Sequence, residues 1–227
     1  MNKSQQGAVA VAFVAFLLSL RKGPGKLIRE PVDPATLKGL FYGNLVSDDF
    51  AAELLAVAAR LGFDPNDLMT VFRIERGKSS DGKSLGRGVY HKYTDKAGVE
   101  HKGNFSYGLF GILPGTAVWL GTTPEAIYNM SDIEQLALVE QYFKKHGWDQ
   151  QGKHPIATFD DIYSGVWGGQ TMIDADLYKV LVDSAKEPKK YEDNKGADFN
   201  KDGRITKKDV LTIARQIYRQ GKKEARQ

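Results

Sequence analysis

Helix-start signals followed by apolar residues at helical spacing recur from Ser47 onwards, and they limit the fold of this 227-residue chain more than any other feature. Ser47 precedes acidic residues and an apolar stripe that stops at Gly62, which predicts a helix between them. Asp64 followed by Pro65 predicts a second helix that reaches about Arg76. The same kinds of signal predict further helices over 114–120, 124–129, 131–145, 158–166, 173–186 and 206–220.

One central segment lacks this helical texture. Residues 78–104 are rich in Gly, Ser, Lys and Asp, with short alternating stretches around 89–93 and 98–101. This pattern predicts a loop with a small β-hairpin. We therefore expect a mainly α fold of the α+β type, in which the helical domain carries one small hairpin. The expected organisation is an apolar segment over 1–22, a linker over 23–46, a folded domain over 47–187, and a loop with a terminal helix over 188–227.

The N-terminal segment contains an uninterrupted apolar run from Ala8 to Leu20, flanked by Lys3 and by Arg21 and Lys22. The run is shorter than the ~20 residues of a typical membrane-spanning helix, and no clear cleavage site follows it. Three interpretations stay open: an uncleaved membrane anchor, a cleaved export signal, or a helix buried against a partner or within a virus particle. We expect membrane or virion components as partners of residues 8–20.

Composition narrows the chemistry. The absence of cysteine excludes disulfides, thiolate metal sites and a cysteine nucleophile. The net charge of +4 and the pI near 9.0 favour an anionic partner such as nucleic acid, phospholipid or an acidic cell-wall polymer. Charge alone does not choose among these.

A calcium-loop pattern lies near the C-terminus. Oxygen-bearing side chains occupy the first, third, fifth, ninth and twelfth positions of a loop that has glycine at its sixth position, Gly203. The predicted Ca²⁺ ligands are Asp198, Asn200, Asp202, the carbonyl of Arg204, Thr206 and Asp209. Asp209 departs from the usual glutamate, and the segment before Asp198 lacks helical texture. The pattern therefore predicts a structural half-site, a loop with an exiting helix; the alternative is a solvated turn.

A glutamate extends the apolar stripe of the helix that begins after Asp64. Leu68, Val71, Phe72 and Glu75 recur at helical spacing and share one face. Burial and the C-terminal end of a helix both disfavour a carboxylate, and a glutamate that stays protonated near neutral pH can serve as a general acid. The alternative is an ion pair with a neighbouring arginine, Arg73 or Arg76.

Three stretches, Asp64–Glu75, Tyr107–Ala117 and Ser131–Phe143, resemble the soluble lytic transglycosylases and goose-type lysozymes, particularly phage-encoded members. The resemblance covers roughly residues 47–185. It implies that Glu75 is the catalytic residue, and that the substrate-binding residues are Tyr107, Gly108, Leu109 and Tyr163. Two positions depart from the family: Gly111 replaces its glutamine, and the usual asparagine is missing beside Tyr163.

The activity implied by this resemblance is cleavage of the β-1,4 bond between N-acetylmuramic acid and N-acetylglucosamine. The protein would be membrane-anchored or virion-associated and would act on the bacterial cell wall in the periplasm. Glu75 would protonate the leaving oxygen and then deprotonate the muramyl C6 hydroxyl, forming a 1,6-anhydro ring. Two alternatives stay open. One is a hydrolytic lysozyme that uses a second carboxylate among Asp81, Asp95 and Glu100. The other is a non-catalytic glycan-binding structural protein of the same fold. The two tyrosines would stack on sugar or contact Glu75, or else pack in the core.

Two further patterns carry no expected function. Residues 77–84 fit the phosphate-loop consensus, but the strand-to-helix context that the loop requires is missing, so no nucleotide is expected. Nucleic acid is not an expected partner. The four histidines lack metal-ligand spacing and are interpreted as surface or loop residues: His91, His101, His146 and His154.

Overall fold

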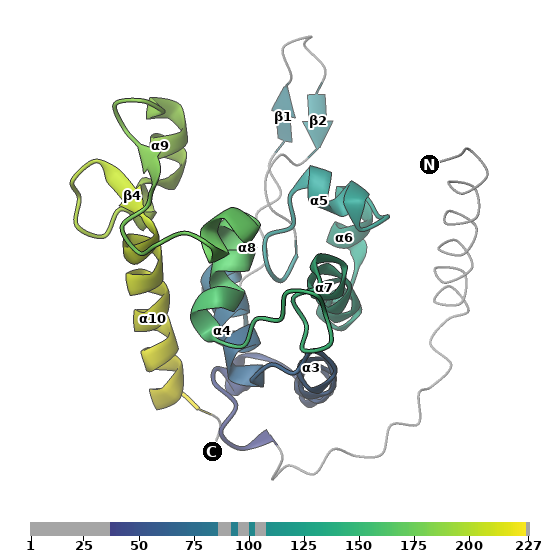
Figure 1. Cartoon of the computed structure of the whole chain (residues 1–227). Coiled ribbons are helices and arrows are strands. Elements are labelled where there is room, and N and C mark those ends of the chain that lie inside the picture. The colour runs from purple at the N-terminus through teal and green to yellow at the C-terminus, as the bar shows by residue number, and fades with distance from the viewer. Residues whose placement is uncertain (1–36, 86–91, 95–99, 103–107, 226–227) are drawn as a thin grey trace.

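The computed structural model describes residues 37–85, 92–94, 100–102 and 108–225. Within these ranges the fold is mainly helical with a small β-hairpin, which confirms the expected class (Figure 1). The α-helices are α3 (Asp48–Leu61), α4 (Pro65–Arg76), α5 (Pro114–Trp119), α6 (Pro124–Asn129), α7 (Asp132–His146), α8 (Phe159–Ile173), α9 (Pro188–Asn194) and α10 (Lys207–Lys223). The short 3₁₀ helices are η1 (Gly43–Leu45) and η2 (Lys195–Ala197). The apolar run Ala8–Leu20 lies outside the described residues.

The helix ends follow the capping residues of the sequence. The side chain of Ser47 accepts a hydrogen bond from Phe50 N (3.2 Å) at the start of α3, which ends at Gly62 with a φ of 75°. Ser131 opens α7 with a reciprocal capping box, in which Glu134 Oε2 accepts from Ser131 N at 2.7 Å. The predicted helices at these positions are therefore confirmed.

Four short strands make two antiparallel pairs. Strands β1 (Lys92–Thr94) and β2 (Glu100–Lys102) form the predicted hairpin. Strands β3 (Val180–Asp183) and β4 (Arg204–Thr206) form a second pair, with Val182 opposite Ile205. Both of these apolar side chains are fully buried. The predicted helix over 173–186 is wrong, because its apolar residues are used in a strand that pairs with β4, in the distant predicted calcium loop.

Helix α8 is also longer than predicted. It runs on from the expected end near residue 166 to Ile173, with a break at Gly169 (φ 65°, ψ −159°). That backbone conformation is open to glycine and strained for other residues. The break redirects the last turn of α8, so that the helix bends at its glycine-rich end.

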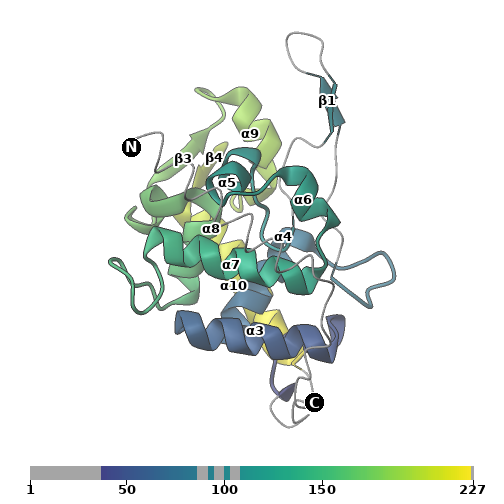
Figure 2. The same cartoon turned by 90° about the vertical axis from the view of Figure 1, so that its right-hand side faces the viewer.

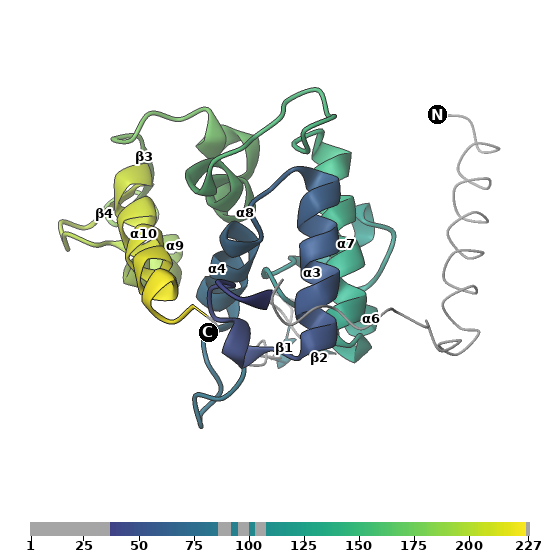
Figure 3. The same ribbon diagram turned by 90° about the horizontal axis from the view of Figure 1, so that it is seen from below.

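Helix α4 is the centre of the fold. It packs against α3, α8 and α10, and α3 packs in turn along α7. Seen from below, α10 lies on one side of α4, while α3 and α7 lie side by side on the other (Figure 3). The turned view in Figure 2 shows α7 in front of this arrangement, with β1 extending away from the helices. Helix α4 as a whole is thus held by three neighbouring helices.

Residues at both ends of the described chain belong to the core. Leu37, Leu40 and Tyr42, from the segment expected to be a linker, are buried. The Phe41 ring packs against Tyr218 of α10 with ring centroids 5.2 Å apart. Strands and helices of the C-terminal segment join the same apolar cluster. The described part of the linker and the terminal helix are therefore packed onto the predicted domain.

Candidate functional site

Glu75 lies in the last turn of α4, directly after a fully buried stripe. The helix starts where Asp64 Oδ1 accepts from Asn66 N at 2.8 Å, and Leu68, Val71 and Phe72 are almost completely inaccessible. Glu75 itself keeps some accessible surface. Burial of its carboxyl among protein atoms raises the pKa of Glu75 to about 7. Its carboxyl is therefore able to hold a proton near neutral pH.

The two neighbouring arginines interact elsewhere. Arg76 Nη1 forms an ion pair with Oδ1 of Asp132, the first residue of α7, at 2.6 Å. The Arg73 guanidinium lies over the Tyr42 ring, 5.7 Å from its centroid. Among the described residues, no arginine forms an ion pair with Glu75. The alternative of a Glu75–arginine pair is thus not what the structure shows.

Tyr163, on the neighbouring helix α8, lies close enough to Glu75 for the two groups to interact electrostatically. Its side chain is only 6% exposed and stacks on Phe159, with ring centroids 6.2 Å apart. Burial raises the pKa of the Tyr163 hydroxyl far above its usual value, and the nearby Glu75 carboxylate raises it further. The structure thus brings together two of the predicted site residues that are far apart in sequence.

The segment after the hairpin is fixed by a buried glutamine on α7. Gln135 Oε1 accepts from Leu109 N at 2.9 Å, and its amide nitrogen donates to Met130 O at 3.2 Å. Gly108 has a φ of 74°, and a Cβ there would lie 2.4 Å from Gln135 Oε1. The whole Leu109 residue is buried, so the structure shows no accessible surface on this predicted substrate-binding residue. Tyr107 lies outside the described residues.

Gln135 was not singled out from the sequence. Its signal is a polar residue within the apolar pattern of the helix over 131–145, beside Leu136 and Val139, both fully buried. A buried amide there has to find partners, and a nearby loop backbone supplies them.

Two pockets open on the surface of the helical domain. The larger, about 590 Å³, lies where the starts of α3 and α7 meet the end of α4, and its lining includes Arg76, Gly108 and Gln135. The smaller, about 420 Å³, lies between α5, α7 and α8, and we call it the aromatic pocket. Its lining includes Trp119, Tyr142, His146 and Trp167. Glu75 lines neither of these two pockets, although Arg76 lines the first.

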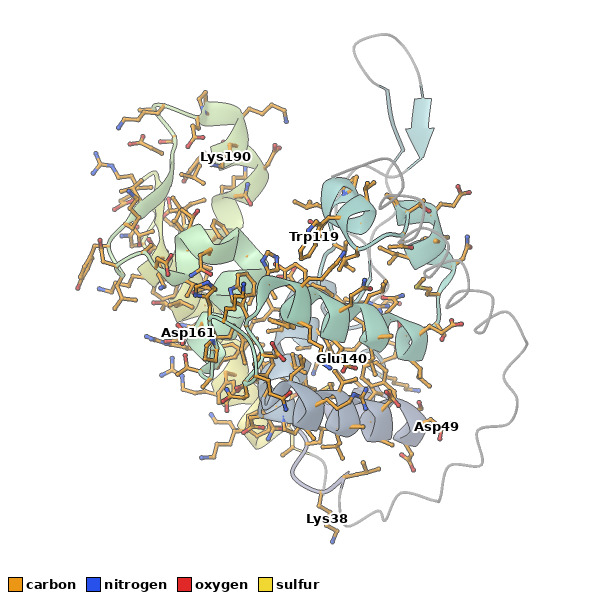
Figure 4. All side chains as sticks on the ribbon, turned by 45° about the vertical axis from the view of Figure 1, so that its right-hand side comes forward. Lys38, Asp49, Trp119, Glu140, Asp161 and Lys190 are labelled. Atoms are coloured by element: carbon orange, nitrogen blue, oxygen red, sulfur yellow. The ribbon has the colours of Figure 1, made fainter. Side chains whose placement is uncertain are left out.

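Aromatic side chains make a continuous cluster beside the smaller pocket. The His146 ring stacks on Trp148 at 4.0 Å with an angle of 9°, and Tyr142 meets His146 at 4.7 Å. Trp119 is 41% exposed and projects from α5 (Figure 4). Burial lowers the pKa of His146. His146 is thus the last residue of α7 and not a loop residue, and it stays partly exposed while its ring packs in this cluster.

The predicted calcium loop is preceded by helix α9 and by η2, contrary to the expected half-site without an entering helix. Pro188 takes the first position of α9. Proline suits this position, because its missing N–H would have no hydrogen-bond partner within the helix. The loop then passes into β4, which β3 braces, and on into α10. Helices therefore lie on both sides of the loop.

Asp198, at the first position of the loop, carries a buried oxygen without a partner. Its residue is only 5% exposed, and Oδ2 accepts from Gly203 N (2.9 Å) and from the Tyr191 hydroxyl (2.7 Å). Oδ1 is buried and has no hydrogen-bond partner among the described residues. Burial acts to raise the pKa of Asp198, but hydrogen bonds from Tyr191 and from backbone amides hold it below its usual value. An anionic oxygen in this position suits a hard cation.

The other predicted ligands are held by local hydrogen bonds. Asn200 Oδ1 accepts from Asp202 N (3.1 Å), and Asp202 Oδ1 accepts from Arg204 N (2.9 Å). Asp209 Oδ2 accepts from Thr206 N at 2.9 Å and forms a capping box at the start of α10. Within the described ranges, no three acidic or histidine side chains converge as a ready metal cluster. The donor set and the orphan Asp198 oxygen fit a cation, which would draw the loop carboxylates together.

Two remaining predictions concern other parts of the chain. The residues 77–84, which fit the phosphate-loop consensus, directly follow helix α4 and form a hydrogen-bonded turn in which Ser79 Oγ donates to Asp81 Oδ1 at 2.6 Å. Across residues 37–85, 92–94, 100–102 and 108–225, no helix combines the length and the apolar character that crossing a membrane requires.

Comparison with known proteins adds no family assignment. No protein-family model matches the sequence, and no curated protein matches it significantly. The resemblance to lytic transglycosylases therefore rests on the three sequence stretches alone.

Proposed function

We propose that this protein is a peptidoglycan-cleaving lytic transglycosylase, phage-encoded, in which Glu75 is the general acid and base. The observation that carries the proposal is Glu75, a partly exposed residue whose buried carboxyl forms no ion pair with its arginine neighbours and has a pKa near 7 beside Tyr163. A general acid works best when its pKa lies close to the working pH. Ordinary surface glutamates lack this property, since water and basic neighbours keep them ionised.

The proposed reaction needs one carboxyl in two roles. Glu75 gives its proton to the glycosidic oxygen as the bond from this oxygen to the muramyl C1 breaks. The ionised Glu75 then takes the proton of the muramyl C6 hydroxyl, whose oxygen bonds to C1 and closes the 1,6-anhydro ring. The proton count balances, and Glu75 returns to its protonated state. No water enters the products.

A hydrolytic outcome would require a second carboxylate to direct water. Of the three predicted candidates, Asp81 is bound to the Ser79 hydroxyl, and this hydrogen bond, together with Lys83 N–H, lowers the pKa of Asp81. Asp95 lies outside the described residues, and Glu100 belongs to strand β2.

The aromatic pocket is where we propose that a glycan binds, although neither Glu75 nor Tyr163 lines it. Its wall on α8 begins two residues after Tyr163, at Gly165, and continues to Gly169. Exposed aromatic rings such as Trp119 bury large apolar area against flat ligands, and a sugar ring offers such a face. Pockets of this size bind ligands of one or two rings. We therefore assign the aromatic pocket to the glycan strand.

The test is product analysis. Wild-type protein incubated with purified peptidoglycan is expected to release muropeptides with 1,6-anhydro ends, seen by mass spectrometry as products lighter by one water than hydrolysed ones. Glu75→Gln should release none, because an amide cannot donate this proton. Glu125→Gln, an exposed glutamate on α6, is the matched control and should behave as wild type. Release by Glu75→Gln, or by neither protein, would refute the assignment; hydrated ends would indicate hydrolysis.

We also propose that the loop over 198–209 binds structural Ca²⁺ through Asp198, Asn200, Asp202, the carbonyl of Arg204, Thr206 and Asp209. The buried, unpartnered Asp198 Oδ1 is the observation in its favour. Added Ca²⁺ should raise the melting temperature, because the cation binds the folded loop preferentially, and a chelator should reverse the rise. Asp198→Ala should abolish the response, while Asp193→Ala on α9 should keep it. An unchanged response in Asp198→Ala would contradict the site.

We also propose where the protein acts and with which partners. The predicted partners are peptidoglycan strands, and membrane or virion components at residues 8–20. Under these proposals the protein acts on the periplasmic cell wall from a membrane or a particle.

A further inference from the structure

Helix α10 leaves the candidate calcium loop and then contacts both helices of the candidate active site. It packs on α4, which carries Glu75, and on α8, which carries Tyr163. In Figure 1, α10 descends from β4 and passes alongside α8 and α4. One helix therefore connects the loop to both parts of the site.

The first contact is a buried lysine at the start of α10. Lys207 is 7% exposed, and its Nζ donates to Ile173 O (2.8 Å) and Ala175 O (3.0 Å) at the C-terminal end of α8. A buried ammonium is stable only when it is hydrogen-bonded, and the end of a helix supplies carbonyls with partial negative charge. Lys207 thus fixes the last turn of α8, beyond the break at Gly169.

Further contacts join α10 to both helices along its length. Arg215 forms an ion pair with Asp160 at the start of α8. Tyr218 packs on Phe159, with ring centroids 4.8 Å apart, and interacts with the buried Asp67 of α4. Near the end of α10, Glu224 lies 2.8 Å from Lys78, three residues after Glu75. The relative position of α4 and α8 therefore depends on where α10 lies.

The loop and the lysine share the first turn of α10. Thr206 and Asp209, two predicted ligands, form the capping box that starts this helix, and Lys207 lies between them. Without a cation, the carboxylates of Asp198, Asp202 and Asp209 repel one another when the loop closes. With a cation, the loop and the first turn are held together.

We propose that Ca²⁺ bound in the loop over 198–209 stabilises α4 and α8 through α10, with Lys207 as the positioning residue that transmits binding to α8. The inference rests on the proposed calcium site and not on the enzymatic activity.

Hydrogen exchange measured by mass spectrometry tests the inference on the full chain. In the wild type, saturating Ca²⁺ should slow exchange about fivefold or more in α4 (65–76) and α8 (159–173), in addition to the loop and α10. Lys207→Met should bind Ca²⁺ with an affinity within about threefold of wild type by calorimetry, since no predicted ligand is changed. Its Ca²⁺-dependent protection of α8 should be lost. Lys208→Met, an exposed neighbour, should respond as wild type.

Each result decides a separate point. Ca²⁺ binding without any protection of α4 and α8 in the wild type would overturn the coupling and leave the metal site intact. Full protection of α8 in Lys207→Met would overturn the role of that lysine. No heat of binding in the wild type would remove the metal site and the coupling together. The wild-type comparison needs no variant, so it decides the coupling even if Lys207→Met fails to fold.

Discussion

At the scale of single residues, the position of Glu75 determines its chemistry. Three buried apolar residues precede it on the same face of α4, and the neighbouring arginines turn to Asp132 and to Tyr42. Removal from water without a compensating positive charge is what raises its pKa. The same residue at an exposed helix end would be ionised at neutral pH.

The first prediction at this scale concerns pH. The pKa of Glu75 is raised from 4.5 to about 7. The protonated carboxyl, which donates the proton, is therefore almost fully populated below about pH 6 and is lost as the pH rises through 7. The kcat/KM on purified peptidoglycan should therefore fall on the alkaline side with a midpoint near 7, about tenfold per further pH unit. Binding of Glu75→Gln to the same substrate, measured over the same range, separates binding from chemistry. An alkaline midpoint below 5 would contradict the proposed role.

At the scale of elements, the helices with strong caps were predictable and the pairing of distant segments was not. The starts of helices α3, α4 and α7 could be predicted from their N-capping residues, which are Ser47, Asp64 and Ser131. An N-cap bonds to amides within the first turn of its own helix, so it can be recognised locally in the sequence. Strand β3 forms only because β4 lies beside it, and no local pattern near Val180 shows this. The role of Gln135 was not predicted for the same reason, since its partner Leu109 comes from another segment.

A prediction for the segment between hairpin and α5 follows from its close contact with α7. Gly108→Ala places a Cβ 2.4 Å from Gln135 Oε1 at a positive φ, so it should strain the backbone and break the Leu109–Gln135 hydrogen bond. The expected loss is about 2–4 kcal/mol of unfolding free energy in urea denaturation. Gly39→Ala is the control, because its φ is also positive but no atom lies within 4 Å of its Cβ. Equal losses in the two variants would mean that only backbone strain matters.

At the scale of the whole molecule, the candidate site is assembled from segments far apart in the chain. Glu75 comes from α4, Tyr163 from α8, and Trp119 from α5. The sequence predicted Glu75 and Tyr163 separately, but it did not show the aromatic pocket, whose walls come from three helices. Helical spacing describes one element at a time, so a pocket between elements is seen only after folding.

The pocket gives a prediction about glycan binding. Trp119→Ala should weaken the binding of a chitooligosaccharide to the Glu75→Gln protein about five- to thirtyfold, because an exposed ring that would cover a sugar is lost. Isothermal titration calorimetry measures this directly. Tyr178→Ala removes an exposed aromatic side chain that does not line the pocket and should leave the affinity unchanged. Equal affinities for Trp119→Ala and the parent protein would place the glycan elsewhere.

The packing of α10 on α4 has a consequence for synthesis in the cell. Residues 207–223 leave the ribosome long after Glu75, yet they cover one side of the helix that carries it. Domains form their tertiary contacts only when both partners have been translated. Helix α4 therefore gains the packing of α10 only after residues 207–223 have been synthesised, so Glu75 does not reach its final surroundings before that point.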